Sequence, residues 1–169
     1  MVEKYNVPNP SEQISLFDAH RDRFDVNIHS SQSFAHFKNF TPVYSFQYAS
    51  MKNSNVCLNN KNITSKDFHK VFDSFKKYSK TTYLEMSQQE VFHWHEVKWG
   101  EVTFREVDFL RCLTPKITDV ETPTVYQFDL FAEARIMGFI HHGIFYVVWL
   151  DRNHKAYDRQ NKGKKKKER

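Results

Sequence analysis

Two apolar runs near the C-terminus constrain the fold more than any other feature of this chain. Residues 136–140 (Ile-Met-Gly-Phe-Ile) and 144–150 (Ile-Phe-Tyr-Val-Val-Trp-Leu) are separated only by His141, His142 and Gly143. Two such runs joined by a short segment that contains glycine predict a β-hairpin. We place His141 and His142 in its turn, because a tight turn requires residues that tolerate a positive φ.

Other stretches predict further strands and at least one helix. Alternation of large apolar residues with smaller or polar ones, the period of a half-buried strand, occurs over residues 43–48, 91–99, 107–113 and 125–131. Thr64 with Asp67 three residues later forms a capping pattern that predicts a helix start. Apolar residues then follow at spacings of three and four, namely Phe68, Val71, Phe72, Phe75 and Tyr78. Residues 81–86 have a second start of this kind, which predicts a short helix.

This order of elements predicts an α+β fold. One or two helices pack on one face of a mainly antiparallel β-sheet, and the sheet ends in the C-terminal β-hairpin. The 169 residues suit one domain. We expect a partly ordered N-terminal arm over residues 1–40, a single α+β domain over 41–157, and a basic, disordered tail over 158–169.

The net charge of +5 is concentrated in that tail. Residues 162–169 carry six basic side chains and one acid, and removing them leaves 19 charges of each sign on residues 1–161. A lysine run binds polyanions with little selectivity, so we expect RNA or another polyanion to bind through the tail. The candidate nucleic-acid-binding residues are Arg152, Lys155, Lys164, Lys165, Lys166 and Lys167.

The sequence also excludes several classes of protein. The first residues carry charges and prolines where a signal peptide is apolar, and no stretch approaches the ~18 apolar residues that cross a bilayer. We therefore expect a cytoplasmic protein without a membrane partner. Cys57 and Cys112 lie far apart and outside any C-x-x-C spacing, which is typical of free thiols. We expect no cofactor.

Histidines are the main candidates for chemistry. His93 and His95 stand two apart on a predicted strand, so their side chains share a face, where a metal site is one alternative. The other is metal-independent cleavage of RNA, which needs a general base, a general acid and a cation on the phosphate. Histidine suits both proton roles. The candidate catalytic residues are His93, His95 and His154, with Arg135 as phosphate clamp and Tyr157 as a further donor.

Three stretches carry a resemblance to known families. Tyr44–Tyr48, Phe92–Trp99 and the terminal Gly138–Tyr157, with its Ile-Phe-Tyr-Val-Val-Trp-Leu-Asp strand followed by His154 and Tyr157, resemble a family of small uncharacterised bacterial and phage proteins. That resemblance covers residues 43–157 and implies no activity. The layout is also similar to that of RelE-like ribonuclease toxins, which implies helices before an antiparallel sheet and a last strand that ends in a polar cluster. The neutral body and long N-terminal arm depart from those toxins.

Two functions of different class follow from these patterns. The first is a small nucleic-acid-directed protein of a mobile-element or defence setting, in one form a toxin-like, metal-independent ribonuclease. The second is a non-enzymatic protein-interaction module that inhibits or senses a phage or host protein, which the aromatic-rich neutral body favours.

Overall fold

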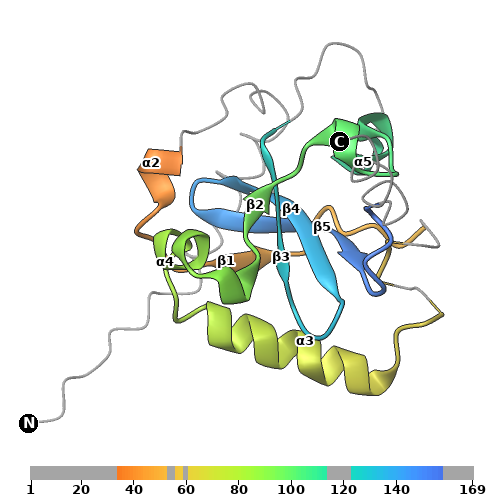
Figure 1. Cartoon of the computed structure of the whole chain (residues 1–169), viewed down its shortest axis with the longest axis horizontal. Helices are drawn as coiled ribbons and strands as arrows, with labels where there is room; N and C mark the ends of the chain where they lie inside the picture. The colour runs from red at the N-terminus through yellow and green to blue at the C-terminus, as the bar shows by residue number, and fades with distance from the viewer. Residues whose placement is uncertain (1–33, 53–55, 59–60, 114–122, 158–169) are drawn as a thin grey trace, which may run out of the picture. The chain divides into compact units, whose positions relative to one another are not determined.

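A computed structural model describes residues 34–52, 56–58, 61–113 and 123–157, which all belong to one compact unit. Its sheet has five strands in the order β1-β5-β4-β3-β2 (Figure 1). The strands are β1 (Val43–Ser45), β2 (His95–Glu96), β3 (Val125–Asp129), β4 (Arg135–His141) and β5 (Ile144–Asp151). All neighbours are antiparallel except β1, which runs parallel to β5. The predicted α+β fold with its C-terminal hairpin is confirmed.

The turn between β4 and β5 consists of two residues with positive φ. His142 has φ 49° and Gly143 has φ 78°. Gly143 is also sterically required, because an added Cβ would lie 2.5 Å from the ring of Phe40, and its carbonyl accepts a hydrogen bond of 3.0 Å from Tyr83. His142 therefore lies in the turn as predicted, whereas His141 is the last residue of β4 and pairs with Ile144.

A β-bulge determines which side chains of the hairpin point to each of the two faces of the sheet. The partner on β5 changes from Trp149 to Val147 between Met137 and Gly138, so Val148 is an extra residue. A Cβ on Gly138 would collide with the backbone carbonyl oxygen of Tyr146 and lie 2.7 Å from the ring of Phe145. The glycine thus permits the close approach of β4 and β5 at this irregularity.

Two helices cover one face of the sheet. They are α3 (Ser65–Tyr78) and α4 (Tyr83–Gln88), and each begins with the capping box expected from Thr64 with Asp67 and from Thr82 with Glu85. Both helices confirm their predictions. Val71, Phe75 and Tyr78 are buried in the core, but Phe68 and Phe72 are 40% and 63% exposed, so only part of the predicted apolar face packs on the sheet.

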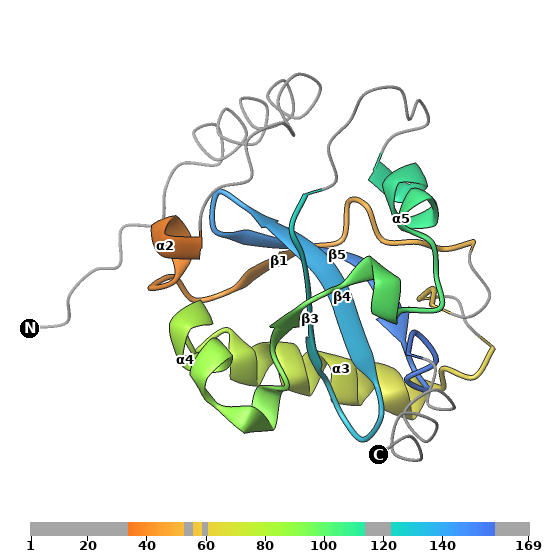
Figure 2. The ribbon, with the colours of Figure 1, turned by 45° about the horizontal axis from the view of Figure 1, so that its top comes forward.

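A third helix covers the opposite face, and here the sequence-based prediction is wrong. Residues 107–113 belong to α5 (Glu106–Leu113) and not to a strand. Their apolar positions satisfy a helical spacing as well as a period of two, because Phe109, Leu110 and Leu113 lie on one side of a helix. The ring of Phe109 lies 5.2 Å from that of Trp149 on the sheet. Helices therefore cover both faces (Figure 2).

The predicted strand at residues 91–99 is also largely wrong. Only His95–Glu96 pairs, as β2, between the short 3-10 helices η1 (Glu90–Phe92) and η2 (Trp99–Glu101). His93 ends η1 in the left-handed region at φ 44° and turns the chain. Trp94 then stacks on the rings of Tyr126 and Phe128. His93 and His95 consequently do not share the face of one regular strand.

The N-terminal part of the described chain packs on the core. The short helix α2 (Phe34–Phe37) buries Phe37, whose ring lies 5.5 Å from that of Tyr83. Residues 1–33 of the predicted arm and the predicted tail, residues 158–169, lie outside the described residues.

Candidate functional site

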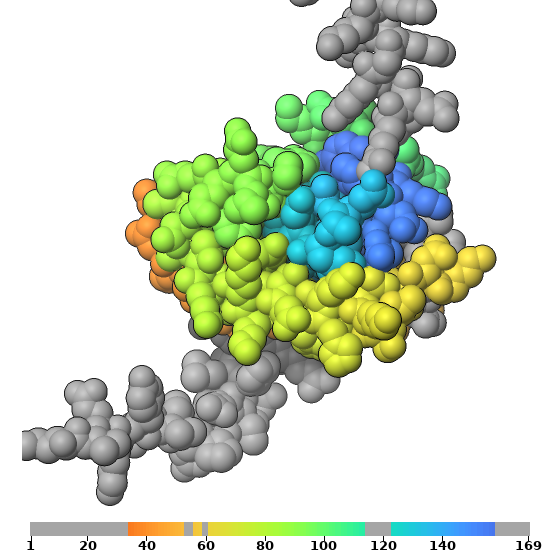
Figure 3. Space-filling view, turned by 60° about the horizontal axis from the view of Figure 1, so that its bottom comes forward, coloured from red at the N-terminus to blue at the C-terminus, as the bar shows by residue number. Residues whose placement is uncertain are grey.

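Three segments that are distant in sequence meet at one end of the sheet. The register pairs Asp129 of β3 with Arg135 of β4, and Arg135 in turn with Asp151 of β5. The segment around His93 and the loop that follows Asp151 lie next to these three paired residues. Figure 3 shows the β3–β4 turn in cyan, the segment before α5 in green and the C-terminal segment in blue, all meeting beside α3.

Asp129 is the centre of the site. One carboxylate oxygen, Oδ2, lies 2.9 Å from Nδ1 of His93, and Oδ1 lies 2.6 Å from Nε of Arg135. Burial raises the pKa of Asp129 above the usual carboxyl range, while electrostatic interactions with Arg135, His93 and His154 partly offset that effect. Arg135, His93 and His154 therefore all interact with a single half-buried carboxyl group.

His93 is held in an orientation that suits a general base. Its side chain is 64% exposed, although its ring nitrogen Nδ1 is engaged by Asp129. A neutral imidazole that donates from Nδ1 keeps its lone pair on Nε2. A carboxylate that accepts a hydrogen bond from Nδ1 of a histidine selects this tautomer. It also stabilises the imidazolium that forms when Nε2 takes a proton.

His95 has both of its ring nitrogens engaged. Nδ1 lies 2.9 Å from the carbonyl oxygen of His93, and since a carbonyl can only accept, Nδ1 carries the proton. Nε2 lies 3.1 Å from the hydroxyl of Tyr157. Burial, together with the charge of Glu101, raises the pKa of Tyr157 to about 12, so its phenol keeps its proton and can donate it to Nε2 of His95. This pair connects β2 to the C-terminal loop.

The loop that presents His154 and Tyr157 is organised by Asp151. This carboxylate is fully buried and accepts backbone N–H bonds from Asn153, Lys155 and Ala156 at 3.3, 2.9 and 2.7 Å. Asp151 thus caps the turn that follows β5. His154 has a left-handed φ of 51°, and its ring centroid lies 5.7 Å from that of Tyr157.

A second set of backbone contacts fixes the end of this loop. Val102 forms an isolated antiparallel bridge with Tyr157, and the amide of Thr103 donates to the carbonyl of Ala156 at 2.7 Å. The two anchors, at Asp151 and at Tyr157, hold the intervening residues from both ends.

The five candidate catalytic residues lie in this one region of the molecule. They are His93, His95, Arg135, His154 and Tyr157. The sequence did not single out Asp129, whose only local signal is its position at the end of an alternating strand. Arg135 holds Asp129 and also donates from Nη1 to the carbonyls of Ala132 and Ala134, so much of its guanidinium is used within the protein.

Of the candidate nucleic-acid-binding residues, Arg152 and Lys155 lie within the described part of the chain. Arg152 donates from Nη2 to Asp67 at 3.0 Å, and its guanidinium lies 5.1 Å from the ring centre of Phe131. It therefore links the start of α3 to the C-terminal loop. Lys155 is exposed, and Lys164 to Lys167 lie outside the described residues.

Two general properties of the described chain complete the site. No three His, Cys, Asp or Glu side chains among the described residues gather as a metal-binding group. Within the same ranges, no helix combines the length and the apolar character that crossing a membrane requires.

The fold and the site define a small α+β protein with a histidine–aspartate cluster at one end of its sheet. The chain belongs to the family described as Uncharacterised protein UU032, whose model matches residues 33–169. No curated protein matches the chain. No solved structure matches it either. Membership of an uncharacterised family, which the sequence predicted, is confirmed.

Proposed function

We propose that this protein cleaves RNA without a metal ion, by transfer of protons between histidines and the ribose–phosphate backbone. The observation that carries the proposal is the shared carboxylate: Asp129 engages His93 directly and interacts with His154 electrostatically. Two imidazoles beside one carboxylate supply the base and the acid that this chemistry requires.

The reaction assigns a distinct role to each group. Nε2 of His93 removes the proton from a ribose 2′-hydroxyl, and the 2′-oxygen attacks the adjacent phosphorus. The bond from phosphorus to the 5′-oxygen breaks, and the leaving oxygen takes a proton from the imidazolium of His154. The products are a 2′,3′-cyclic phosphate and a 5′-hydroxyl end. Asp129 stabilises the imidazolium formed on His93, while His95 and Tyr157 hold the surrounding segments in place.

The biological setting is part of the same proposal. A nucleic-acid-directed protein of a mobile element or a defence system, with the layout of RelE-like toxins, fits this chemistry. The lysines at positions 164 to 167 would add non-selective attraction for RNA.

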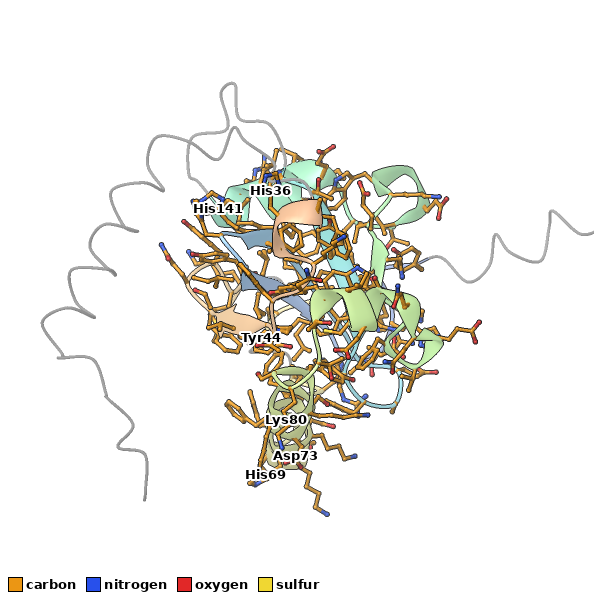
Figure 4. The ribbon with its side chains drawn as sticks, turned by 90° about the vertical axis from the view of Figure 1, so that its left-hand side faces the viewer. His36, Tyr44, His69, Asp73, Lys80 and His141 are labelled. Carbon is orange, nitrogen blue, oxygen red and sulfur yellow. The ribbon has the colours of Figure 1, made fainter. Side chains whose placement is uncertain are left out.

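The test is cleavage of end-labelled RNA by purified protein in the presence of EDTA. We expect wild-type protein to generate 2′,3′-cyclic phosphate ends, and a substrate with a 2′-deoxyribose at the cleaved position to resist. His93→Ala and His154→Ala should each lower the rate by about 10²–10⁴-fold, the usual contribution of a general acid or base. His69→Ala is the matched control, because His69 is exposed on α3 and points away from the sheet (Figure 4). Intact RNA, or equal rates for all variants, would refute the proposal.

A second candidate function is a protein-interaction module. Around the outermost strand β1, Phe40, Val43 and Phe46 are 54%, 62% and 42% exposed, which is unusual for large apolar side chains in one region. The module would inhibit or sense a phage or host protein. In that case Phe46→Glu abolishes binding of a partner identified by pull-down and verified with purified components, whereas His93→Ala leaves binding unchanged.

A further inference from the structure

The exposed face of α3 carries a row of basic residues. Lys66, Lys70, Asp73 and Lys77 follow one another at spacings of four, three and four, so they form one stripe along the helix, and Lys80 continues it just beyond the helix end. We call Lys66, Lys70, Lys77 and Lys80 the lysine stripe. Figure 4 shows Asp73 directed away from the sheet. From Lys66 to Lys77 the stripe spans about 16 Å, at 1.5 Å per residue.

Among the described residues, the lysines of the stripe outnumber the acids beside them, because Asp73 is the one acid within the row. No described residue forms an ion pair with any of its four members. The other acid of α3, Asp67, is only 4% exposed and is bound by Arg152. Although the positive and negative charges on residues 1–161 are equal in number, five lysines fall within residues 66–80. The neutral body thus contains one strongly basic face.

The lysine stripe adjoins the histidine–aspartate site. Nζ of Lys70 lies 5.5 Å from the ring centre of Phe131, two residues after Asp129. Nζ of Lys77 lies 5.9 Å from the ring centre of Phe92, the residue before His93. These contacts place two lysines of the stripe next to the segments that supply the general base and its carboxylate.

We infer that the lysine stripe is a track that binds the phosphates of single-stranded RNA and leads the strand to the site. This inference rests on the proposed RNA cleavage. A row of ammonium groups on flexible stems matches a flexible polyanion without reading its sequence. Binding through the stripe is consequently sensitive to salt and indifferent to base identity.

The test measures the salt dependence of binding with a strand that cannot be cleaved. The probe is a fluorescein-labelled, 2′-O-methylated oligonucleotide, followed by anisotropy with the full chain at several salt concentrations. Each lysine that contacts a phosphate of a single strand contributes about 0.7 to the slope of log affinity against log salt concentration. The double variant Lys70→Gln/Lys77→Gln should therefore lower the slope by about 1.4. Its thermal unfolding should match that of the wild type, since both side chains are exposed.

The double variant Lys52→Gln/Lys98→Gln is the matched control. It removes the same charge from the α5 side of the sheet, where Lys52 lies in a cleft with Arg111 and Lys98 precedes Trp99, whose ring packs on Phe109. It should retain the wild-type slope. Equal slopes for both double variants, or no binding by wild-type protein, would overturn the inference.

The two experiments distinguish a failure of the proposed RNA cleavage from a failure of the proposed RNA binding by the lysine stripe. If the stripe variant loses salt-dependent binding while wild-type protein leaves RNA intact, the track stands and the proposed reaction falls. If wild-type protein cleaves RNA and the stripe variant keeps the full slope, the reaction stands and the track falls.

Discussion

At the scale of single residues, carboxylates in different surroundings behave in opposite ways. Asp129 is half-buried beside histidines, and burial raises its pKa. Asp67 accepts hydrogen bonds from the backbone amide and hydroxyl of Thr64 and from Arg152, and these bonds lower its pKa despite its burial. The first arrangement is typical of a functional site, whereas the second is typical of a helix cap.

Asn in place of Asp129 should separate activity from stability. A carboxyl group with a raised pKa stabilises the fold at low pH, and this contribution is lost as the pH rises through its folded-state pKa. We therefore expect Asp129→Asn to keep or raise the melting temperature at pH 7 while lowering RNA cleavage by about 10²-fold or more. Calorimetry and the cleavage assay measure the two effects. Asp73→Asn, on the exposed face of α3, should leave the melting temperature unchanged.

Asn in place of Asp67 should have the opposite effect on stability. A lowered pKa contributes stability that is present above the usual carboxyl range and is lost as the pH falls through the folded-state pKa. We expect Asp67→Asn to lower the free energy of unfolding by about 1–3 kcal/mol at pH 7, because hydrogen bonds to a charged acceptor are weakened. The difference from wild type should shrink toward pH 2–3, measured by urea unfolding at both pH values. A difference that is independent of pH would contradict this account.

At the scale of elements, the hairpin β4–β5 and its bulge determine the arrangement of the core. Phe145, Val147 and Leu150 join the core cluster under α3, whereas Trp149 packs on Phe109 of α5. The extra residue at the bulge allows Val147 and Leu150, three positions apart, to point to the same face. Because helices cover both faces of the sheet, β5 is buried along almost its whole length.

The glycine at the bulge provides a test of this arrangement. Gly138→Ala introduces a Cβ that meets a backbone carbonyl of the neighbouring strand, which cannot move as a side chain can. We expect a loss of about 1–3 kcal/mol in the free energy of unfolding, the usual cost of overpacking. Gly100→Ala is the control, because nothing lies within 4 Å of the added atom, and it should change stability by less than about 0.5 kcal/mol. Equal stability of the two variants in urea unfolding would show that β4 and β5 separate easily.

At the scale of the whole molecule, charge is distributed unevenly. The basic tail accounts for the net charge, and the rest of the chain has equal numbers of acids and bases. On the described part of that chain, the lysine stripe concentrates positive charge on one face beside the histidine–aspartate site.

The tail should contribute affinity for RNA but no chemistry. Replacing Lys164, Lys165, Lys166 and Lys167 by Gln should weaken binding of a single-stranded oligonucleotide and lower the salt slope by up to about 2.8. The melting temperature and the position of cleavage should not change, because neither depends on long-range attraction. Anisotropy titrations, calorimetry and mapping of cleaved ends measure these properties. A changed cleavage pattern would place the tail in the site.

Local signals explain the elements that the sequence predicted well. The hairpin has two long apolar runs and a turn with a glycine, and α3 has a capping box followed by a helical period. Segments 91–99 and 107–113 were predicted less well. In α5 the apolar positions fit two periods, and at His93 a left-handed backbone conformation interrupts an alternating pattern that has no glycine or proline to mark the turn.

The sequence by itself therefore determined the hairpin, the two capped helices, the α+β class and the residue types capable of proton transfer. Only the tertiary structure decided that His93 and Arg135 contact Asp129, that His154 interacts with it electrostatically, and that α3 presents its lysines beside this site. The physical reason is that local periodicity governs contacts within an element, whereas strand register and loop anchoring bring together residues as distant as 93 and 154. The pairing of β3 with β4 brings Arg135 next to Asp129. No local sequence pattern around Asp129 predicts this pairing.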